Sequence, residues 1–186
     1  YDGENYIIYA HFTDESFNKV NYINYFDANG RKYKREIFDT RGFLSVGKYL
    51  TVKQKILFEH ILDTSGNIVI EKYYNPEAQK HTLTRMTLTY NNAVYHLNKE
   101  SELLTIFAES IYKPGDFFFS DKNNVTALGL ANTHSDIPVI AVLHSTHLKY
   151  EHRAEIINVK NTYKDLFNHL ARFKGLITST AQQRED

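Results

Sequence analysis

Residues 19–38 read KVNYINYFDANGRKYKREIF, two alternating segments separated by Asp27-Ala28-Asn29-Gly30. Alternation of apolar and polar residues is typical of a β-strand with one covered face. Asp and Gly favour a tight turn between strands, because Asp bonds to backbone amides and Gly adopts the positive φ that closes the turn. The stretch therefore predicts a β-hairpin.

The same turn recurs along the first half of the chain. Gly30, Gly42 and Gly66 lie on a twelve-residue grid with Gln54 at the missing position, and an Asp precedes each glycine by three residues. Strands at this spacing predict an antiparallel meander. We expect its strands near residues 5–12, 18–26, 31–38, 43–50, 55–62, 67–74, 81–90 and 93–97.

The chain is rich in aromatic residues, with 14 Tyr and 12 Phe, and most of them precede residue 114. One interpretation is packing on a half-covered sheet, which suits Tyr and Phe. The other is that one face of the sheet recognises another chain. A long meander also has two open edges, and these need a partner or another domain to cover them.

Composition excludes several classes of protein. The 186 residues carry 22 basic and 22 acidic side chains, and this balance argues against a nucleic-acid binder. The absence of cysteine excludes disulfides and thiolate metal sites and fits the cytoplasm. No apolar run reaches the roughly 20 residues that a membrane span needs. Because the sequence begins at Tyr1 without Met and ends in the first turn of a helix, we interpret it as part of a longer polypeptide.

From residue 99 onward, helices alternate with short apolar strands, which is typical of a parallel α/β sheet. We expect strands at 116–120, 137–143 and 175–179, helices at 99–112, 124–132 and 161–173, and a further helix starting at 182. Inward positions are expected at Leu103, Leu104, Phe107, Ala108 and Ile111 of the first helix, and at Tyr163, Leu166, Phe167 and Leu170 of the third. The predicted fold class is α+β, with an antiparallel meander over 1–98 and part of a doubly wound α/β domain over 99–186.

Ligands of open parallel sheets bind at the carboxyl ends of the strands. Here these ends carry Ser120-Asp121, then the segment His144-Ser145-Thr146-His147, then Thr178-Ser179-Thr180. Histidine is the side chain best suited to proton transfer near neutral pH. His144 and His147 are therefore candidate functional residues, although a histidine in this place can also simply cap loop carbonyls.

Other kinds of site find less support. A zinc site needs three or four ligands, and no third ligand stands at a diagnostic spacing from the two histidines. Ser145 lacks the glycines of a nucleophile elbow, and neither phosphate-binding glycine motif occurs. The basic cluster Arg31, Lys32, Lys34 and Arg35 is explained by a solvated hairpin, because alternation divides it between the two faces of the sheet.

Three segments carry a resemblance to a known family. They are residues 137–148, IPVIAVLHSTHL, residues 163–186, YKDLFNHLARFKGLITSTAQQRED, and residues 24–45, NYFDANGRKYKREIFDTRGFLS. Together they resemble the acceptor-side half of bacterial GT-B glycosyltransferases that have a β-meander inserted into an N-terminal Rossmann-like domain. This Gram-positive group includes the poly(glycerol-phosphate) and poly(ribitol-phosphate) glycosyltransferases of wall teichoic acid and the enzymes that add N-acetylglucosamine to serine-rich or Ser-Asp-repeat adhesins.

The resemblance implies a retaining transfer of glucose or N-acetylglucosamine from a UDP-sugar to a polymeric acceptor, without a further cofactor or metal. His144 matches the family's active-site histidine, and we expect His147, Ser145 and Asp121 to bind substrate. The meander matches the region used for acceptor recognition and for assembly with another subunit. The donor site would lie in a C-terminal domain that this sequence lacks, so the fragment alone is expected to be inactive.

A second function class stays open. The meander can instead belong to a non-catalytic protein–protein interaction module in which the α/β half is a scaffold and the histidines are structural. Both hypotheses predict a homo- or hetero-oligomer that forms through the meander, in the cytoplasm or peripherally at a membrane.

Overall fold

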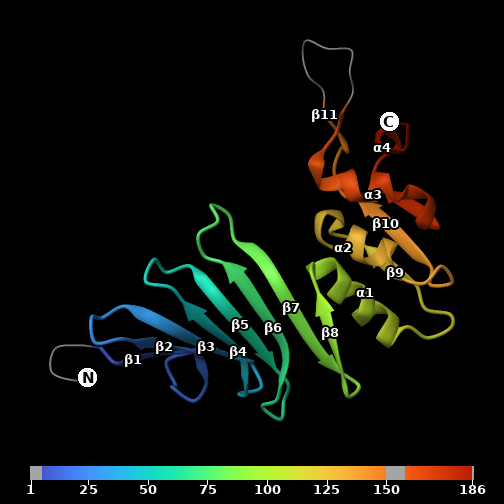
Figure 1. Ribbon diagram of the computed structural model, residues 1–186. Coiled ribbons are helices and arrows are strands. Elements are labelled where there is room, and N and C mark those ends of the chain that lie inside the picture. The colour runs from blue at the N-terminus through green and yellow to red at the C-terminus, as the bar shows by residue number, and fades with distance from the viewer. Residues whose placement is uncertain (1–5, 150–157, 186) are drawn as a thin grey trace. The chain divides into compact units, whose positions relative to one another are not determined.

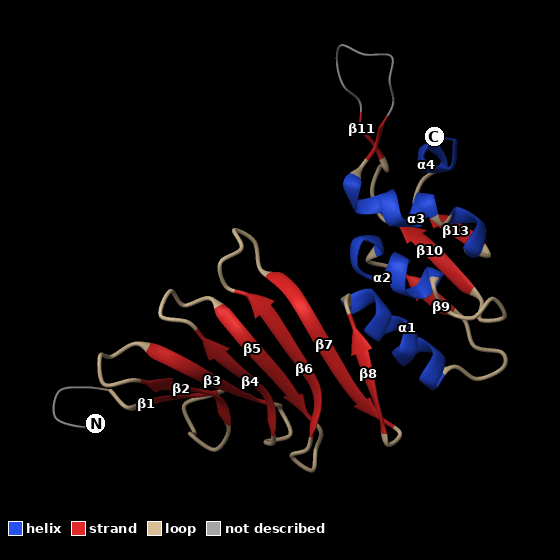
Figure 2. Ribbon diagram, viewed as in Figure 1, coloured by secondary structure: helices blue, strands red, loops and turns tan. Residues whose placement is uncertain are grey.

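The computed structural model describes residues 6–149 and 158–185, and it divides the chain into two compact units, residues 1–99 and 100–186 (Figure 1). The first unit is an antiparallel sheet, and the second combines a small parallel sheet with helices (Figure 2). The predicted α+β class is confirmed. In the described part of the chain, no helix is both long enough and apolar enough to cross a membrane.

The first unit is an eight-stranded meander in which every strand pairs with the next one along the chain. Its strands lie within one to three residues of the expected bounds, because alternation and turn residues are local signals. They are β1 (Ile8–Phe12), β2 (Val20–Phe26), β3 (Lys32–Phe38), β4 (Leu44–Leu50), β5 (Ile56–Leu62), β6 (Ile68–Asn75), β7 (Thr82–Tyr90) and β8 (Ala93–Leu97).

The turns between β2 and β6 follow the twelve-residue grid of the sequence. All four grid positions have positive φ, including Gln54 at 61° in place of a glycine. In the first turn, the Gly30 amide donates to the Asp27 carbonyl, and the Asp27 carboxylate accepts from the Asn29 and Arg31 amides. Each turn is followed by a shift in strand register, which is a β-bulge.

Substitution of Gly42 by alanine should lower the free energy of unfolding by about 1–2 kcal/mol, because φ at this position is +93°. An added Cβ would meet no atom within 4 Å, so the cost comes from the backbone alone. Gly175→Ala is the matched control, since Gly175 is equally uncrowded but lacks positive φ. Urea unfolding checks the pair, and equal losses for both variants would contradict this explanation of the grid.

The second unit contains a three-stranded parallel sheet in the order β13-β10-β9. The parallel sheet predicted from the alternating helices and strands is thus confirmed. Its elements are α1 (Glu100–Ile111), β9 (Phe118–Ser120), α2 (Asn123–Ala131), β10 (Val139–Leu143), α3 (Lys164–Asn168), β13 (Gly175–Thr178) and α4 (Ala181–Glu185). A short antiparallel pair, β11 (Leu148–Lys149) with β12 (Asn158–Val159), was not expected from the sequence.

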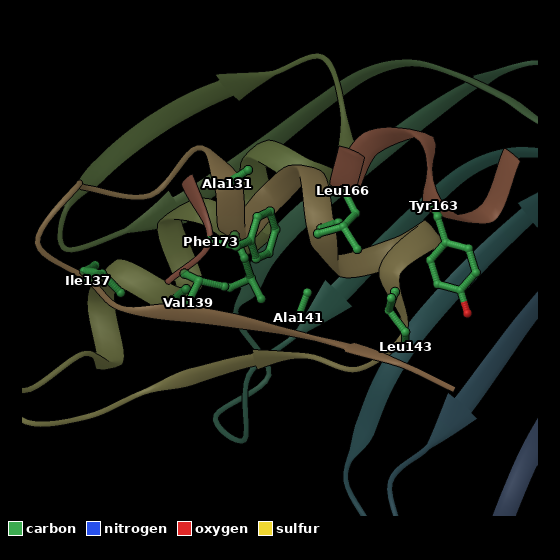
Figure 3. Packing of buried hydrophobic residues seen from close by; sticks show 11 residues of the cluster. Ala131, Ile137, Val139, Ala141, Leu143, Tyr163, Leu166 and Phe173 are labelled. Carbon is green, nitrogen blue, oxygen red and sulfur yellow. The ribbon is translucent and has the colours of Figure 1, made fainter. Parts of the chain in front are cut away.

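The core of the second unit lies between β10 and the helices (Figure 3). β10 alternates, so that Val139, Ala141 and Leu143 are buried. Leu166 from α3 and Ala131 from α2 complete the same cluster. These contacts fix the carboxyl end of β10, where the site begins.

Three positions expected to face inward are exposed instead. Phe107 and Ile111 of α1 are exposed, and this helix contributes Ala108 and Leu104 to the core. Leu170 is also exposed, because the helix expected over 161–173 is broken into two 3₁₀ turns flanking the five-residue α3. A change of helix type rotates the following side chains away from the stripe that a continuous α-helix would give.

Candidate functional site

The parallel sheet brings its strand ends together. β9 and β13 flank β10, with Ser120 paired to Ala141 and Thr178 paired to Leu143. Asp121 and His144, which the sequence placed at two separate strand ends, therefore become neighbours. The third end contributes Ser179 and Thr180 to the same edge.

His144 and Asp121 form a direct contact, with 2.5 Å between Nε2 of the imidazole and Oδ1 of the carboxylate. Both side chains are exposed, at 61% and 71%. An ionised carboxylate only accepts hydrogen bonds, so this contact places a proton on Nε2. In the neutral ring Nδ1 is then an acceptor, and it can take a hydrogen bond or a proton from a ligand hydroxyl.

A cleft of about 400 Å³ opens beside His144. The described residues that line it carry hydroxyl, amide and imidazole groups beside their aliphatic atoms, and none of them is Lys, Arg, Asp or Glu. The lining residues are His144, Ser145, Thr146, Ser179, Thr180, Gln182 and Gln183. Such a surface donates and accepts hydrogen bonds without net charge, which suits a polyhydroxylated ligand.

Buried polar groups hold both walls of the cleft. The Tyr163 hydroxyl lies 3.1 Å from Ser145 Oγ and also donates to the Ser145 carbonyl at 3.3 Å. On the other wall, Gln183 Oε1 accepts from both the amide and the hydroxyl of Ser179. Behind the strand ends, Asn123 Nδ2 donates to the Val142 carbonyl. These bonds fix the loops after β10 and β13.

His147 does not join the cleft. Its side chain is only 5% exposed and packs against Phe167, with 5.3 Å between the ring centroids. Its Nδ1 is buried without a hydrogen-bond partner among the described residues. The structure thus brings together three of the four expected site residues, His144, Ser145 and Asp121, whereas His147 lies beneath the loop.

Sequence reasoning missed Tyr163 and Gln183 as parts of the site. The sequence does indicate a role for Gln183, because Thr180-Ala181-Gln182-Gln183 has the spacing of a capping box. In the structure, Thr180 Oγ1 accepts a hydrogen bond from the Gln183 backbone amide. For Tyr163, the sequence indicates only an inward position on a helix. The described residues contain no group of three or more His, Cys, Asp or Glu side chains able to hold a metal ion.

Replacement of Tyr163 by phenylalanine should destabilise the protein by about 1 kcal/mol, because it removes only the hydroxyl bonds to Ser145. Amide hydrogen exchange in residues 144–147 should rise at the same time. Tyr112→Phe is the control, since this ring packs against the same core and its hydroxyl has no such bond to the loop. Unchanged exchange in the Tyr163 variant would show that the loop is held by other contacts.

One face of the meander is a second candidate surface. An aromatic row with interleaved cations runs across it, formed by directly paired residues Tyr25, Lys34, Tyr49, Phe58, Tyr73 and Arg85. The Lys34 ammonium lies 5.0 Å from the centre of the Tyr25 ring, and the Arg85 guanidinium lies 4.3 Å from that of Tyr73. Burial opposes ionisation of Glu36 beside this row, but hydrogen bonds from Lys34 and Tyr25 outweigh it and lower the pKa of the carboxyl group.

The fold and the cleft together define the class of protein. This is an α+β protein in which an antiparallel meander precedes a parallel sheet, and a cleft lined by Ser, Thr, Gln and His residues lies at the carboxyl ends of that sheet. The sequence matches no family model and no curated protein.

Several solved structures share this fold. The pneumococcal O-GlcNAc transferase GtfA, solved with UDP and GlcNAc, matches at a TM-score of 0.73 and 15% identity, over 96% of this chain and 34% of its own. A mutant of S. aureus TarM in complex with fondaparinux, alpha-GlcNAc-glycerol and UDP matches at a TM-score of 0.66 and 16% identity. The match covers 97% of this chain and 37% of the TarM chain. The Glycosylation Associate Protein complex from Streptococcus agalactiae matches at a TM-score of 0.62 and 19% identity. The match covers 96% of this chain and 34% of the other chain.

These likenesses confirm the fold that the resemblance in sequence implied. The chain spans about a third of the length of the proteins it matches.

Proposed function

We propose that this chain is the acceptor-binding part of a retaining glycosyltransferase that moves glucose or N-acetylglucosamine from a UDP-sugar to a polymeric acceptor. The acceptor would be a wall teichoic acid or a serine-rich adhesin, and the reaction would take place in the cytoplasm. The observation that carries the proposal is the uncharged cleft beside the His144–Asp121 pair. It is supported by the fold shared with GtfA and TarM structures that were solved with UDP and a GlcNAc-containing molecule.

The cleft is suited to positioning a sugar hydroxyl. In the transfer, the acceptor oxygen bonds to the anomeric carbon, its proton passes to Nδ1 of His144, and UDP leaves with the electrons of the broken bond. Nδ1 of His144 would accept the hydrogen bond of a sugar hydroxyl, while Asp121 holds the ring in the required tautomer. Cationic groups usually stabilise the leaving diphosphate. The cleft has none, so we assign that task to another domain of the whole protein.

We assign acceptor recognition and subunit assembly to the meander. Its aromatic row gives flat apolar contacts and two cations, a combination suited to a flexible polymer.

The second candidate function, an interaction module without catalysis, is favoured by the edge strand β1. This strand, IYAHF, carries no Lys, Asp, Glu or Pro, and its Ile8 and Tyr9 are exposed. Natural edge strands usually carry such residues to prevent pairing with other chains. We therefore expect either function to involve an oligomer.

Sugar transfer and donor hydrolysis by the full-length protein, measured side by side, test the assignment of the two units. Deletion of residues 18–95 should abolish transfer to the polymer and oligomer formation, while UDP release by donor hydrolysis continues. Circular dichroism and amide exchange over residues 100–186 establish that the second unit stays folded. Unchanged acceptor affinity and unchanged mass in the deletion variant would refute the role of the meander.

A further inference from the structure

A second hollow lies in the meander, between the β2–β3 turn and the β4–β5 turn. Its volume is about 520 Å³, and it is lined by Asn24, Phe26, Gly30, Arg31, Lys32, Val52 and Gln54. Gln54 Nε2 donates to the Lys32 carbonyl at 2.8 Å, and this bond ties the two turns together. The hollow belongs to the first unit, and its lining shares no residue with the cleft beside His144.

The β-bulge after the β2–β3 turn determines which basic side chains lie at this hollow. The register passes from Tyr25 opposite Lys34 to Phe26 opposite Lys32, so β3 carries one extra residue at this point. Strict alternation would place Lys32 and Arg35 on opposite faces of the sheet. With the extra residue, Lys32 lies on the face of Phe26 and Asn24, where Arg35 Nε donates to Asn24 Oδ1.

The basic cluster is divided between the two faces of the sheet, as expected from the sequence, but the bulge moves Lys32 away from the face of Lys34, where strict alternation would place it. Arg31 and Lys32 line the hollow and Arg35 borders it, whereas Lys34 remains on the opposite face with Glu36.

These three cations have no acidic partner among the residues that the structure describes. Neighbouring lysines of the sheet are paired, Lys34 with Glu36 at 2.6 Å and Lys48 with Glu59 at 2.8 Å. Burial, and then the nearby charge of Arg35, lower the pKa of Lys32. Like charges held together in this way are unfavourable unless an anion joins them.

The remaining lining adds neutral donors and an apolar wall. Asn24 is 7% exposed, and its Oδ1 is occupied by Arg35, which leaves the Nδ2 hydrogens as donors. Phe26 and the exposed Val52 provide apolar surface beside the cations. A ligand that satisfies both parts has an anionic group and a short organic substituent.

We propose that this hollow binds a phosphate group carried on an organic substituent, with Arg31, Lys32 and the Asn24 amide as its ligands. Lys and Arg are the usual partners of phosphate oxygens, and charge-assisted hydrogen bonds of this kind are about twice as strong as neutral ones. This hollow shares no lining residue with the His144 cleft, so loss of the catalytic role of His144 would leave the binding of phosphate at this place unaffected.

Titration of the intact protein with sn-glycerol 3-phosphate and with inorganic phosphate tests the proposal. Saturable changes are expected in the NMR signals of the Gly30 amide and the Gln54 side chain, with tighter binding of the ester. Lys32→Met should weaken the binding roughly tenfold or more. The same variant should unfold at an equal or higher temperature than wild type when no phosphate is present, because it removes a repulsive charge.

Lys53→Met is the matched control, since Lys53 lies in the same turn as Val52 and Gln54 but pairs with Glu77 at 3.5 Å. Equal weakening by both variants, or the absence of Lys32-dependent binding to the ester, to inorganic phosphate and to anionic vesicles alike, would overturn the site. Vesicles of phosphatidylglycerol and of phosphatidylcholine identify the source of the phosphate. Lys32-dependent binding to the anionic vesicles, absent with the soluble ester, would assign the site to a lipid headgroup, and binding of the ester alone to a soluble or polymeric phosphate.

Discussion

Replacement of His144 by alanine in the full-length protein is expected to lower kcat/KM for sugar transfer by about a hundredfold or more, the usual scale for loss of a general base. Among the described residues that line the cleft, His144 alone carries a titratable side chain. Its Nδ1 is the atom left to accept from a ligand hydroxyl once Nε2 is bonded to Asp121. The measurement is the initial rate of labelled sugar incorporation into the acceptor.

Ser145→Ala provides the control for this prediction. It changes the neighbouring lining residue and removes one contact to Tyr163, but it leaves the imidazole and Asp121 in place. We expect a loss of only a few-fold, as for one neutral hydrogen bond. Turnover close to wild type in the His144 variant would refute the catalytic role and favour the interaction module.

Truncation of Leu166 to alanine should cost about 2–5 kcal/mol of unfolding free energy, the range measured for fully buried leucines. Leu166 is 0% exposed and packs in the cluster that includes Leu143, the residue before His144. The loss should appear in urea unfolding and as faster amide exchange within residues 100–186.

Leu170→Ala is a matched control four residues away. Its side chain is 40% exposed, because the broken helix turns it out of the core. Its truncation should cost less than about 1 kcal/mol. Equal losses at the two positions would mean that a continuous helix, as first expected from the sequence, describes this segment better.

The meander could be predicted closely because its signals are local. Period-two alternation and the turn at every twelfth residue set the strands, and even Gln54 adopts the positive φ of the glycines that it replaces. The strand ends of the parallel sheet were equally readable, since short apolar runs end at Ser120, Leu143 and Thr178. The order of these strands, which makes Asp121 and His144 neighbours, is known only from the structure.

Features that depend on tertiary packing could not be predicted. The burial of His147 against Phe167 depends on where α3 lies, and the role of Tyr163 depends on a loop eighteen residues earlier. The position of Lys32 on the same face as Arg35 depends on a β-bulge, because a single extra residue moves Lys32 to the other face of the sheet.

A double-mutant cycle between Asp121 and His144, measured by the rate of sugar transfer in the full-length protein, tests the central claim most directly. If Asp121 acts by orienting His144, Asp121→Ala should slow transfer by at least about tenfold in the wild-type background and change nothing further once His144 is alanine. An equal loss in both backgrounds would show that the two residues act independently, and it would contradict the assignment of the cleft.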